Sequence, residues 1–492
     1  MTRPNIVFLL LDAARADKLS CYDHNRVTSP FIDNLAMNGE LYTQAYSNSI
    51  WSLPSYASIF TGEYPSVHGA VDWGQSINPQ SNILVNKLNQ SGYETHAVTT
   101  HLLTGEHGIS DSFDETKWVN NPNRLPYPND PVTKLVRQDV DAQEWSKDTI
   151  FNAISEAVRQ RSWQVIPNGF AYMLRKWKHT TGRWEDDGAE RIIDYSKEIV
   201  KDATDPFFLF ANFVETHDPY RPPERFIFEY LPEEISIDEA NEVAKSHLVN
   251  LSLETETLTD REREIMLALY DAEIRYIDSK IKEFVEFLKH QGEFENTLLI
   301  ICSDHGDLFG EWGFWGHQGA IHRSLCRVPL IISTPWDCGN KNTYPVELRD
   351  LSRYIPQVAE GEQKSLPEKD GAIVEYHGWD CQISGDQWTK FSSHQRQKWS
   401  AYSASYITNE WQYLVNANGD SWLFPNSNLY PEEMDSTVDE IDIKNELRSK
   451  LVDTVGAPQE NHEVYRNKID NNSRFESVSD GVQEHLKDLG YA

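Results

Sequence analysis

Three short and almost uninterrupted apolar runs stand out along the chain, and polar side chains follow each of them directly. They cover residues 6–11 (IVFLLL), 207–214 (FFLFANFV) and 297–302 (TLLIIC). Runs of this length are typical of central β-strands that are covered on both faces. Helical patterns such as residues 265–288 lie between them. Strands that alternate with helices predict a mostly parallel sheet with helices on both sides.

The apolar pattern weakens after Trp336, which divides the 492 residues into parts of different character. Residues 1–340 predict an α/β domain with a large mixed, mostly parallel sheet flanked by helices, and residues from about 140–200 predict a helical insertion in it. Short strand-like pieces farther on predict a smaller α+β domain, followed by an acidic, partly helical tail. These last two parts are expected at residues 341–435 and 436–492.

The polar residues after the apolar runs predict a shared site. Asp12 follows the first run, residues 215–217 (ETH) follow the second, and residues 303–305 (SDH) follow the third. In open α/β sheets, ligands bind beyond the carboxyl ends of the strands. Each cluster alone has the plain alternative of a solvated strand end, but three together favour one site. Asp12, Asp304 and His305 offer the oxygen and nitrogen ligands that hard or borderline divalent cations take.

The segment 51–69 (WSLPSYASIFTGEYPSVHG) combines signals for the start and the end of a helix. Ser52 has the character of an N-cap, Pro54 suits the first turn, and Gly62 suits a C-terminal cap. A hydroxyl at a helix N-terminus lies beside free backbone N–H groups, which suits an oxyanion such as sulfate or phosphate. A metal on that oxygen would make it a nucleophile. On local sequence alone, a plain capping serine is the alternative.

The charge of the chain limits the kinds of partner. The net charge is -32, from 77 acidic and 45 basic residues. This charge argues against nucleic-acid binding, which needs a basic surface. The plain explanation is a heavily solvated acidic surface of the halophilic type. Because such a surface repels anions, a site for an anionic substrate needs its own positive field, and a metal ion is the natural source.

Residues 159–184 form a basic and aromatic stretch that stands apart from the acidic chain. One interpretation is an entrance or lid that gathers an anionic or lipid-linked substrate. The alternative is an ordinary amphipathic insertion packed on the sheet.

Cysteine usage and the N-terminal run suggest a location. The five cysteines are odd in number and match no zinc spacing, so reduced thiols and an intracellular chain are expected. The run at residues 6–11 is too short for a membrane span and has no cleavage site. The expectation is a cytoplasmic protein without a transmembrane segment.

Four segments resemble, in this order, motifs of the sulfatase family in the alkaline-phosphatase-like superfamily. They read PNIVFLLLDAARAD, SLPSYASIFTGEYPSVHG, FLFANFVETHDPYRPP and SDHGDLFGEWGFWGHQGAIHRSLCRVPLII. The similarity covers most of residues 1–335. It implies an alkaline-phosphatase-like fold and an enzyme that cleaves a sulfuric or phosphoric ester with one divalent metal ion, Ca²⁺, Mn²⁺ or Mg²⁺.

The resemblance also implies roles for individual residues. Asp12, Asp304 and His305 would hold the metal together with the Ser52 oxygen, and Ser52 would be the nucleophile. His217 occupies the place of a family histidine that contacts the ester oxygens or protonates the leaving group.

Three further histidines match family positions more loosely. His101 corresponds to a catalytic histidine near the scissile oxygen, while His317 and His322 fall in the stretch that carries substrate-binding side chains. For all three, the alternative is an ordinary surface or hydrogen-bonded histidine.

The chain departs from the family pattern near the nucleophile and the metal. Ser52 stands where the common motif has Cys, or sometimes Ser, that is converted to formylglycine. Tyr56 replaces the supporting Arg, Ala13 replaces the second Asp of the metal-binding pair, and Thr99 replaces a Lys. The departures argue against formylglycine at Ser52. The remaining set resembles the single-metal site of phosphonate or phosphodiester hydrolases and phosphoethanolamine-type transferases.

Three functions therefore stand side by side. The first is a metal-dependent hydrolase of sulfate esters. The second is a phosphomonoester, phosphodiester or phosphonate ester hydrolase, or a phosphoryl transferase, that uses unmodified Ser52. The third is a family member that binds a glycan or polyanion without catalysis. The expected partner is an anionic ester of a small molecule, a glycan or a lipid-linked group, and the sequence does not indicate an oligomeric state.

Overall fold

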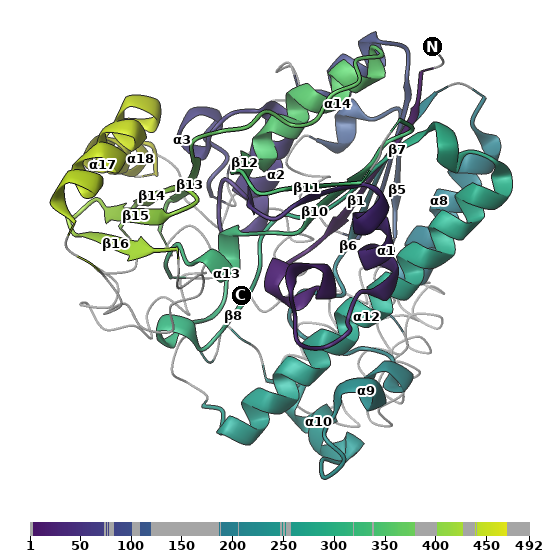
Figure 1. The fold of residues 1–492 in the computed structure, drawn as a ribbon, viewed down its shortest axis with the longest axis horizontal. Helices are drawn as coiled ribbons and strands as arrows, with labels where there is room; N and C mark the ends of the chain where they lie inside the picture. The colour runs from purple at the N-terminus through teal and green to yellow at the C-terminus, as the bar shows by residue number, and fades with distance from the viewer. Residues whose placement is uncertain are drawn as a thin grey trace, which may run out of the picture.

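The protein is a layered α/β structure in which helices lie on both sides of a central sheet (Figure 1). The computed structural model describes residues 3–72, 83–100, 109–119, 188–204, 206–246, 257–317, 319–336, 339–378, 401–426 and 440–469, with several single positions between these ranges. The basic and aromatic stretch at residues 159–184 and most of the expected insertion lie outside the described residues.

The central sheet has eight strands, and parallel pairs dominate it. Its three middle strands, β7, β1 and β6, run parallel to one another, and the antiparallel pairs both involve β10. The strands in spatial order are β11 (Asn340–Asn342), β2 (Glu40–Tyr42), β10 (Leu330–Ser333), β7 (Thr297–Ser303), β1 (Asn5–Leu11), β6 (Phe207–Phe213), β4 (Glu94–Thr99) and β5 (Glu115–Trp118). The three apolar runs thus form the three middle strands, and the predicted mixed, mostly parallel sheet is confirmed.

Strand β1 shows why residues 6–11 are all apolar. Every residue of β1 is buried, because both faces of the strand are covered. Its even-numbered apolar residues share one core with three helices: α2 (Ser52–Thr61), α4 (Leu84–Gln90) and α14 (Leu351–Ala359). Its odd-numbered residues share another core with helices that include α1 (Pro30–Asn38), α8 (Ala189–Asp202) and α12 (Asp260–Gln291). In Figure 1, α2 and α14 lie on one side of the sheet, and α8 and α12 lie on the other.

Helix α12 contains the predicted helical stretch 265–288 and has a defined signal at each end. Thr259 and Glu262 form a capping box at its start, in which each side chain accepts a hydrogen bond from the other residue's backbone N–H. Gly292, with φ 78°, provides the left-handed C-cap. Among the described residues, no helix is both long enough and apolar enough to cross a membrane.

A second, smaller sheet follows at the C-terminal end, as the sequence predicted. It is antiparallel and has the order β13 (Ala372–Tyr376), β14 (Ser403–Ile407), β15 (Trp411–Asn416) and β16 (Ser421–Pro425). Helix α17 (Ile441–Val455) buries Leu447 and Leu451 in the core of this sheet, and α18 (Pro458–Ile469) follows it (Figure 1). The part of the expected tail that the structure describes therefore covers the small sheet.

Phe210, in the middle of β6, tests how much the core under the site contributes to stability. Its ring contacts Phe8 and Phe60, with centroids 5.5 and 5.3 Å away, and it is fully buried. Replacing Phe210 with Ala should lower the free energy of unfolding by about 3–5 kcal/mol, because it leaves a cavity between strand and helix. Urea denaturation measures the loss.

The matched control is Phe228→Ala in α9 (Glu224–Tyr230), where the side chain is 62% exposed. The free energy of unfolding of this variant should stay within about 0.5 kcal/mol of the parent's. Equal losses in the two variants would contradict the packing described for β6.

Candidate active site

Three polar clusters meet at the carboxyl edge of the middle strands. In the register of the sheet, Leu11 pairs with Phe213 on one side and with Ser303 on the other. Asp12 and Asp304 therefore leave neighbouring strands at the same level. The structure thus brings together the clusters that the sequence placed after the apolar runs.

Ser52 approaches the same edge from helix α2. The helix begins at Ser52 itself, and the extended residue Trp51 is its N-cap, so the prediction of Ser52 as N-cap was wrong by one position. The Ser52 Oγ does not cap the helix and lies 3.0 Å from the Nε2 atom of His305. Gly62 forms the left-handed C-cap with φ 80°, as predicted.

Asp12, Asp304 and His305 could hold a metal ion, since their ligand atoms lie within 4.8 Å of one another. The Nε2 atom of His305 is 3.5 Å from a carboxylate oxygen of each aspartate. The opposite ring nitrogen, Nδ1, donates to the backbone oxygen of Gly306 at 2.9 Å, so Nε2 is the nitrogen that remains to bind a cation. All three side chains are fully buried.

The electrostatics of this group fit a cation. Burial raises the pKa of Asp12 well above its usual range, and the charges of Asp304 and Asp307 raise it further. Burial also raises the pKa of Asp304 to about 7, although the backbone N–H of Ala13 and the Ser52 hydroxyl oppose this shift. Burial lowers the pKa of His305 to about 4, which keeps the ring neutral as a metal ligand must be.

Asp304 Oδ2 gives a second indication of fit, because this buried atom has no hydrogen-bond donor among the described residues. Buried carboxylate oxygens normally have a partner, and a divalent ion would be one. The donors are carboxylate oxygens, a hydroxyl and an imidazole nitrogen, which suits Ca²⁺, Mn²⁺ or Mg²⁺.

Ala13, which replaces a metal-binding Asp in the family pattern, has a backbone role. Its φ of 58° is unusual for a non-glycine residue. Its N–H donates to Asp304 Oδ1 at 3.3 Å, and its carbonyl accepts from the Tyr270 hydroxyl at 2.7 Å. The Thr216 hydroxyl holds the carbonyl of Asp12 at 2.6 Å. These contacts fix the turn that carries Asp12.

His217 and His317 line the site beside His305. The ring centroids of His305 and His317 are 4.5 Å apart, and His217 is 5.2 Å from His317 and 6.4 Å from His305. His217 Nδ1 donates to the backbone oxygen of Asp218 at 2.7 Å. Burial lowers the pKa of His317 well below its usual range, and the neighbouring histidines lower it further.

The other candidate histidines are placed differently. The side chain of His322 accepts a hydrogen bond from the Ser324 N–H at 3.0 Å and so caps the short helix α13 (Arg323–Cys326). Its ring packs edge-on against Trp312. His101 lies outside the described residues.

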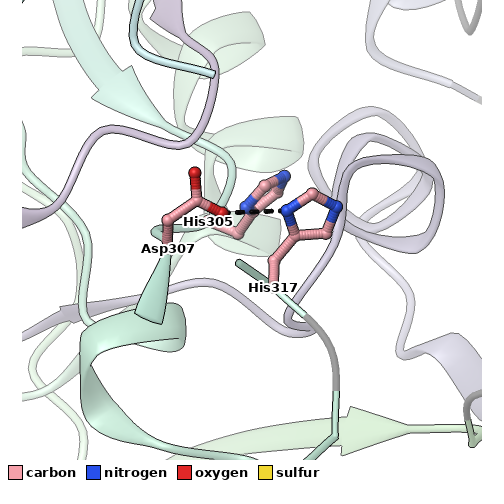
Figure 2. Close-up of side chains that lie close together, drawn as sticks. All are labelled: His305, Asp307 and His317. Carbon is pink, nitrogen blue, oxygen red and sulfur yellow. Dashed lines mark hydrogen bonds and ion pairs between the residues drawn. The ribbon is translucent and has the colours of Figure 1, made fainter. Parts of the chain in front are cut away.

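Sequence reasoning missed Asp307, which the structure places next to His317 (Figure 2). Its Oδ1 accepts from His317 Nδ1 at 2.9 Å, and its Oδ2 accepts from the Tyr220 hydroxyl at 2.6 Å. The only signal in the sequence was a second carboxylate two residues after His305.

Tyr56 fills the position of the family's supporting Arg without its charge. The side chain is fully buried and packs edge-on against Phe210. Burial raises the pKa of its phenol well above the usual range, and the charges of Asp304 and Asp12 raise it further. The phenol therefore stays neutral and brings no positive field to the site.

A hydroxyl, two carboxylates and three imidazoles thus meet at the carboxyl edge of the sheet, an arrangement that can serve the hydrolysis of an ester. The sequence also matches the model of the Sulfatase family over residues 4–353, and the chain belongs to this family.

Curated relatives agree with this assignment, and a solved structure has the same fold. The chain is 26% identical over 383 residues to an arylsulfatase of Clostridium perfringens, covering 74% of this chain and 76% of that protein. It is 28% identical over 409 residues to an N-acetylgalactosamine-6-O-sulfatase of Bacteroides thetaiotaomicron, covering 75% of this chain and 70% of that protein. The phosphonate monoester hydrolase of Agrobacterium radiobacter has a similar fold, with a TM-score of 0.64, 18% identity and coverage of 92% and 95%.

The candidate metal site leads to a binding prediction for Asp12→Asn and Asp304→Asn. Each change removes a carboxylate that would bind the metal directly. Loss of an outer-shell partner lowers metal affinity by about 10- to 100-fold, so Mn²⁺ affinity should fall by more than this. Isothermal titration measures the affinity. Without metal, the Asp12→Asn variant should melt no lower than the parent, because the change removes a repulsion between buried carboxylates.

Asp271→Asn is the matched control. Asp271 is also buried, but it pairs with Arg26 at 3.2 Å and is not one of the candidate ligands. This variant should bind one Mn²⁺ per chain like the parent. Full affinity in Asp12→Asn would remove Asp12 from the ligand set.

Arg15 leads to a prediction about pH. Its guanidinium binds Asp17 and Glu311 at 2.7 Å each. Burial alone would raise the pKa of Glu311, but Arg15 lowers it to about 2, from an ordinary value of 4.5. Because the folded-state pKa is lowered, this stabilisation is complete above the ordinary value and is lost as pH falls towards the folded value.

Arg15→Gln should therefore lower the free energy of unfolding most near neutral pH. The difference from the parent should shrink below about pH 4.5. Urea denaturation of both proteins between neutral and acid pH measures this difference. A difference in free energy of unfolding that stays constant with pH would contradict the ion-pair assignment.

Proposed function

We propose that this chain hydrolyses sulfate esters, with Ser52 as the nucleophile and one divalent cation held by Asp12, Asp304, His305 and the Ser52 oxygen. The observation that carries the proposal is the meeting of these groups. The Ser52 Oγ is 3.0 Å from His305 Nε2, and both aspartates lie 3.5 Å from the same nitrogen.

The protein's own groups would divide the work. Ser52 is the first residue of α2, so the backbone N–H groups and the positive end of the helix dipole lie near an ester bound at its hydroxyl. A bound cation would supply the positive charge that lowers the pKa of a hydroxyl and neutralises an anionic ester. His217 is held through Nδ1, so its Nε2 is the nitrogen that would contact the ester or its leaving group.

The kind of ester is proposed from the relatives. An arylsulfatase and an N-acetylgalactosamine-6-O-sulfatase are among them, so a sulfate ester of an aromatic compound or a glycan is the substrate class. The net charge of -32 supports a local cation, because the rest of the surface repels a sulfate ester.

Phosphonate or phosphodiester hydrolysis is the second candidate, and Tyr56 and Ala13 favour it. A neutral, buried Tyr56 in place of the supporting Arg argues against conversion of Ser52 to formylglycine. Ala13 leaves the site with one carboxylate fewer than the family pattern. A phosphonate monoester hydrolase shares the fold, and an unmodified serine suits phosphoryl chemistry.

The test uses purified protein with Mn²⁺ and two substrates, an aryl sulfate and an aryl phosphonate monoester. Faster cleavage of the aryl sulfate is expected. Ser52→Ala should lower kcat by at least about 1,000-fold, because it removes the nucleophile. Peptide mass spectrometry of Ser52 reports formylglycine as a loss of two hydrogens.

Ser58→Ala is the matched control on the same helix. Ser58 is equally buried, lies six residues after Ser52 on α2, and bonds His68 at 3.1 Å. It should keep the parental kcat. Undiminished activity in Ser52→Ala would exclude Ser52 as the nucleophile, and preference for the phosphonate would select the second candidate.

A further inference from the structure

Asp307 and His317 face each other because of a short hairpin. Strand β8 (Leu308–Phe309) pairs with β9 (Trp315–Gly316) in antiparallel register, with Leu308 opposite Gly316. Continued by one residue, this register sets residue 307 opposite residue 317. The loop that carries His317 is thus folded back onto the residue that follows the metal-binding turn, and His317 Nδ1 lies 2.9 Å from Asp307 Oδ1 (Figure 2).

The Asp307 carboxylate is itself held in place. Its second oxygen accepts from the Tyr220 hydroxyl at 2.6 Å, and its backbone carbonyl accepts from Arg15 Nη1 at 2.9 Å. The Tyr220 ring packs against Tyr270, with centroids 4.9 Å apart. A carboxylate fixed at both oxygens and at its backbone can fix the orientation of a ring that it binds.

His317 is anchored differently from the other two rings. His217 and His305 each donate Nδ1–H to a nearby backbone carbonyl, that of the next residue. Nδ1 of His317 instead meets a carboxylate ten residues away in sequence. Its orientation therefore depends on one side chain that can be replaced without changing the backbone.

We propose that Asp307 is a positioning residue that fixes the tautomer and orientation of His317, so that Nε2 of His317 contacts the ester bound at Ser52. The proposal rests on the proposed function, because the ester is what His317 would contact. Asp307 acts through His317 and does not itself touch the substrate.

A second metal ion at His305, Asp307 and His317 is the competing interpretation, since these ligand atoms also lie within 4.8 Å of one another. Both Asp307 oxygens already accept hydrogen bonds, from His317 and Tyr220. His305 directs Nδ1 to Gly306 and Nε2 to the aspartates. A second ion would have to share His305 with the first and compete with the hydrogen bonds of Asp307, so the geometry favours the hydrogen-bonded pair.

A double-mutant cycle tests the proposal in the metal-loaded protein with the ester it cleaves best. Asp307→Ala should lower kcat/KM by about 10- to 100-fold. Adding Asp307→Ala to His317→Ala should not lower kcat/KM any further, because Asp307 acts only through the His317 ring. Asp307→Asn keeps an acceptor for His317 Nδ1 and should recover most of the activity.

Tyr220→Phe loosens Asp307 but keeps its bond to His317, so kcat/KM should fall less than in Asp307→Ala. The proposal would be overturned if the double variant lost kcat/KM by the product of the two single losses. Two metal ions per chain in the parent with one in Asp307→Asn would also overturn it.

A readout without substrate separates this proposal from the function proposed above. NMR of histidine-labelled protein should show a strongly hydrogen-bonded Nδ1–H of His317 that Asp307→Ala removes and Asp307→Asn retains. Its absence from the parent would overturn the proposal even in an active enzyme. Failure to cleave any ester, with this signal present, would instead count against the proposed function alone.

Discussion

Two carboxylates buried at neighbouring strand ends are the constraint on which the site depends. Asp12 and Asp304 are fully buried beside each other, and burial raises the pKa of both. A buried charge without compensation costs about 3–5 kcal/mol, so a site of this kind is stable as a pair of anions only with a cation between them. The neutral His305 ring and the Ser52 hydroxyl complete a set of ligands for that cation.

The fold creates this constraint and also organises what surrounds it. The parallel register of β7, β1 and β6 sets the aspartates side by side, and α2 brings Ser52 to the same edge. Arg15 and Tyr220 hold Asp307, which in turn holds His317. Each side chain that would contact the ester thus has a partner that orients it. Preorganisation of this kind is how an enzyme favours charge that develops in a transition state.

The sequence predicted the elements that have a clear apolar or helix-end pattern and missed side-chain roles that depend on the backbone geometry of short segments. Apolar runs gave the middle strands, and Gly62 gave the end of α2, because burial and capping leave local signals. The role of Asp307 depends on the pairing of two-residue strands, which are too short to show a period. His322 resembled a substrate ligand in sequence, yet its nitrogen caps α13, a choice that only backbone geometry reveals. His101 and the stretch 159–184 stay predictions.

The proposed chemistry depends most on a single cation between Asp12, Asp304, His305 and Ser52. Diffraction from crystals grown with Mn²⁺, recorded at the manganese absorption edge, tests this directly. One anomalous peak per chain is expected, about 2.0–2.6 Å from the carboxylate oxygens and close to the Ser52 oxygen. No peak at this position, or a peak between Asp307 and His317, would contradict the proposed chemistry.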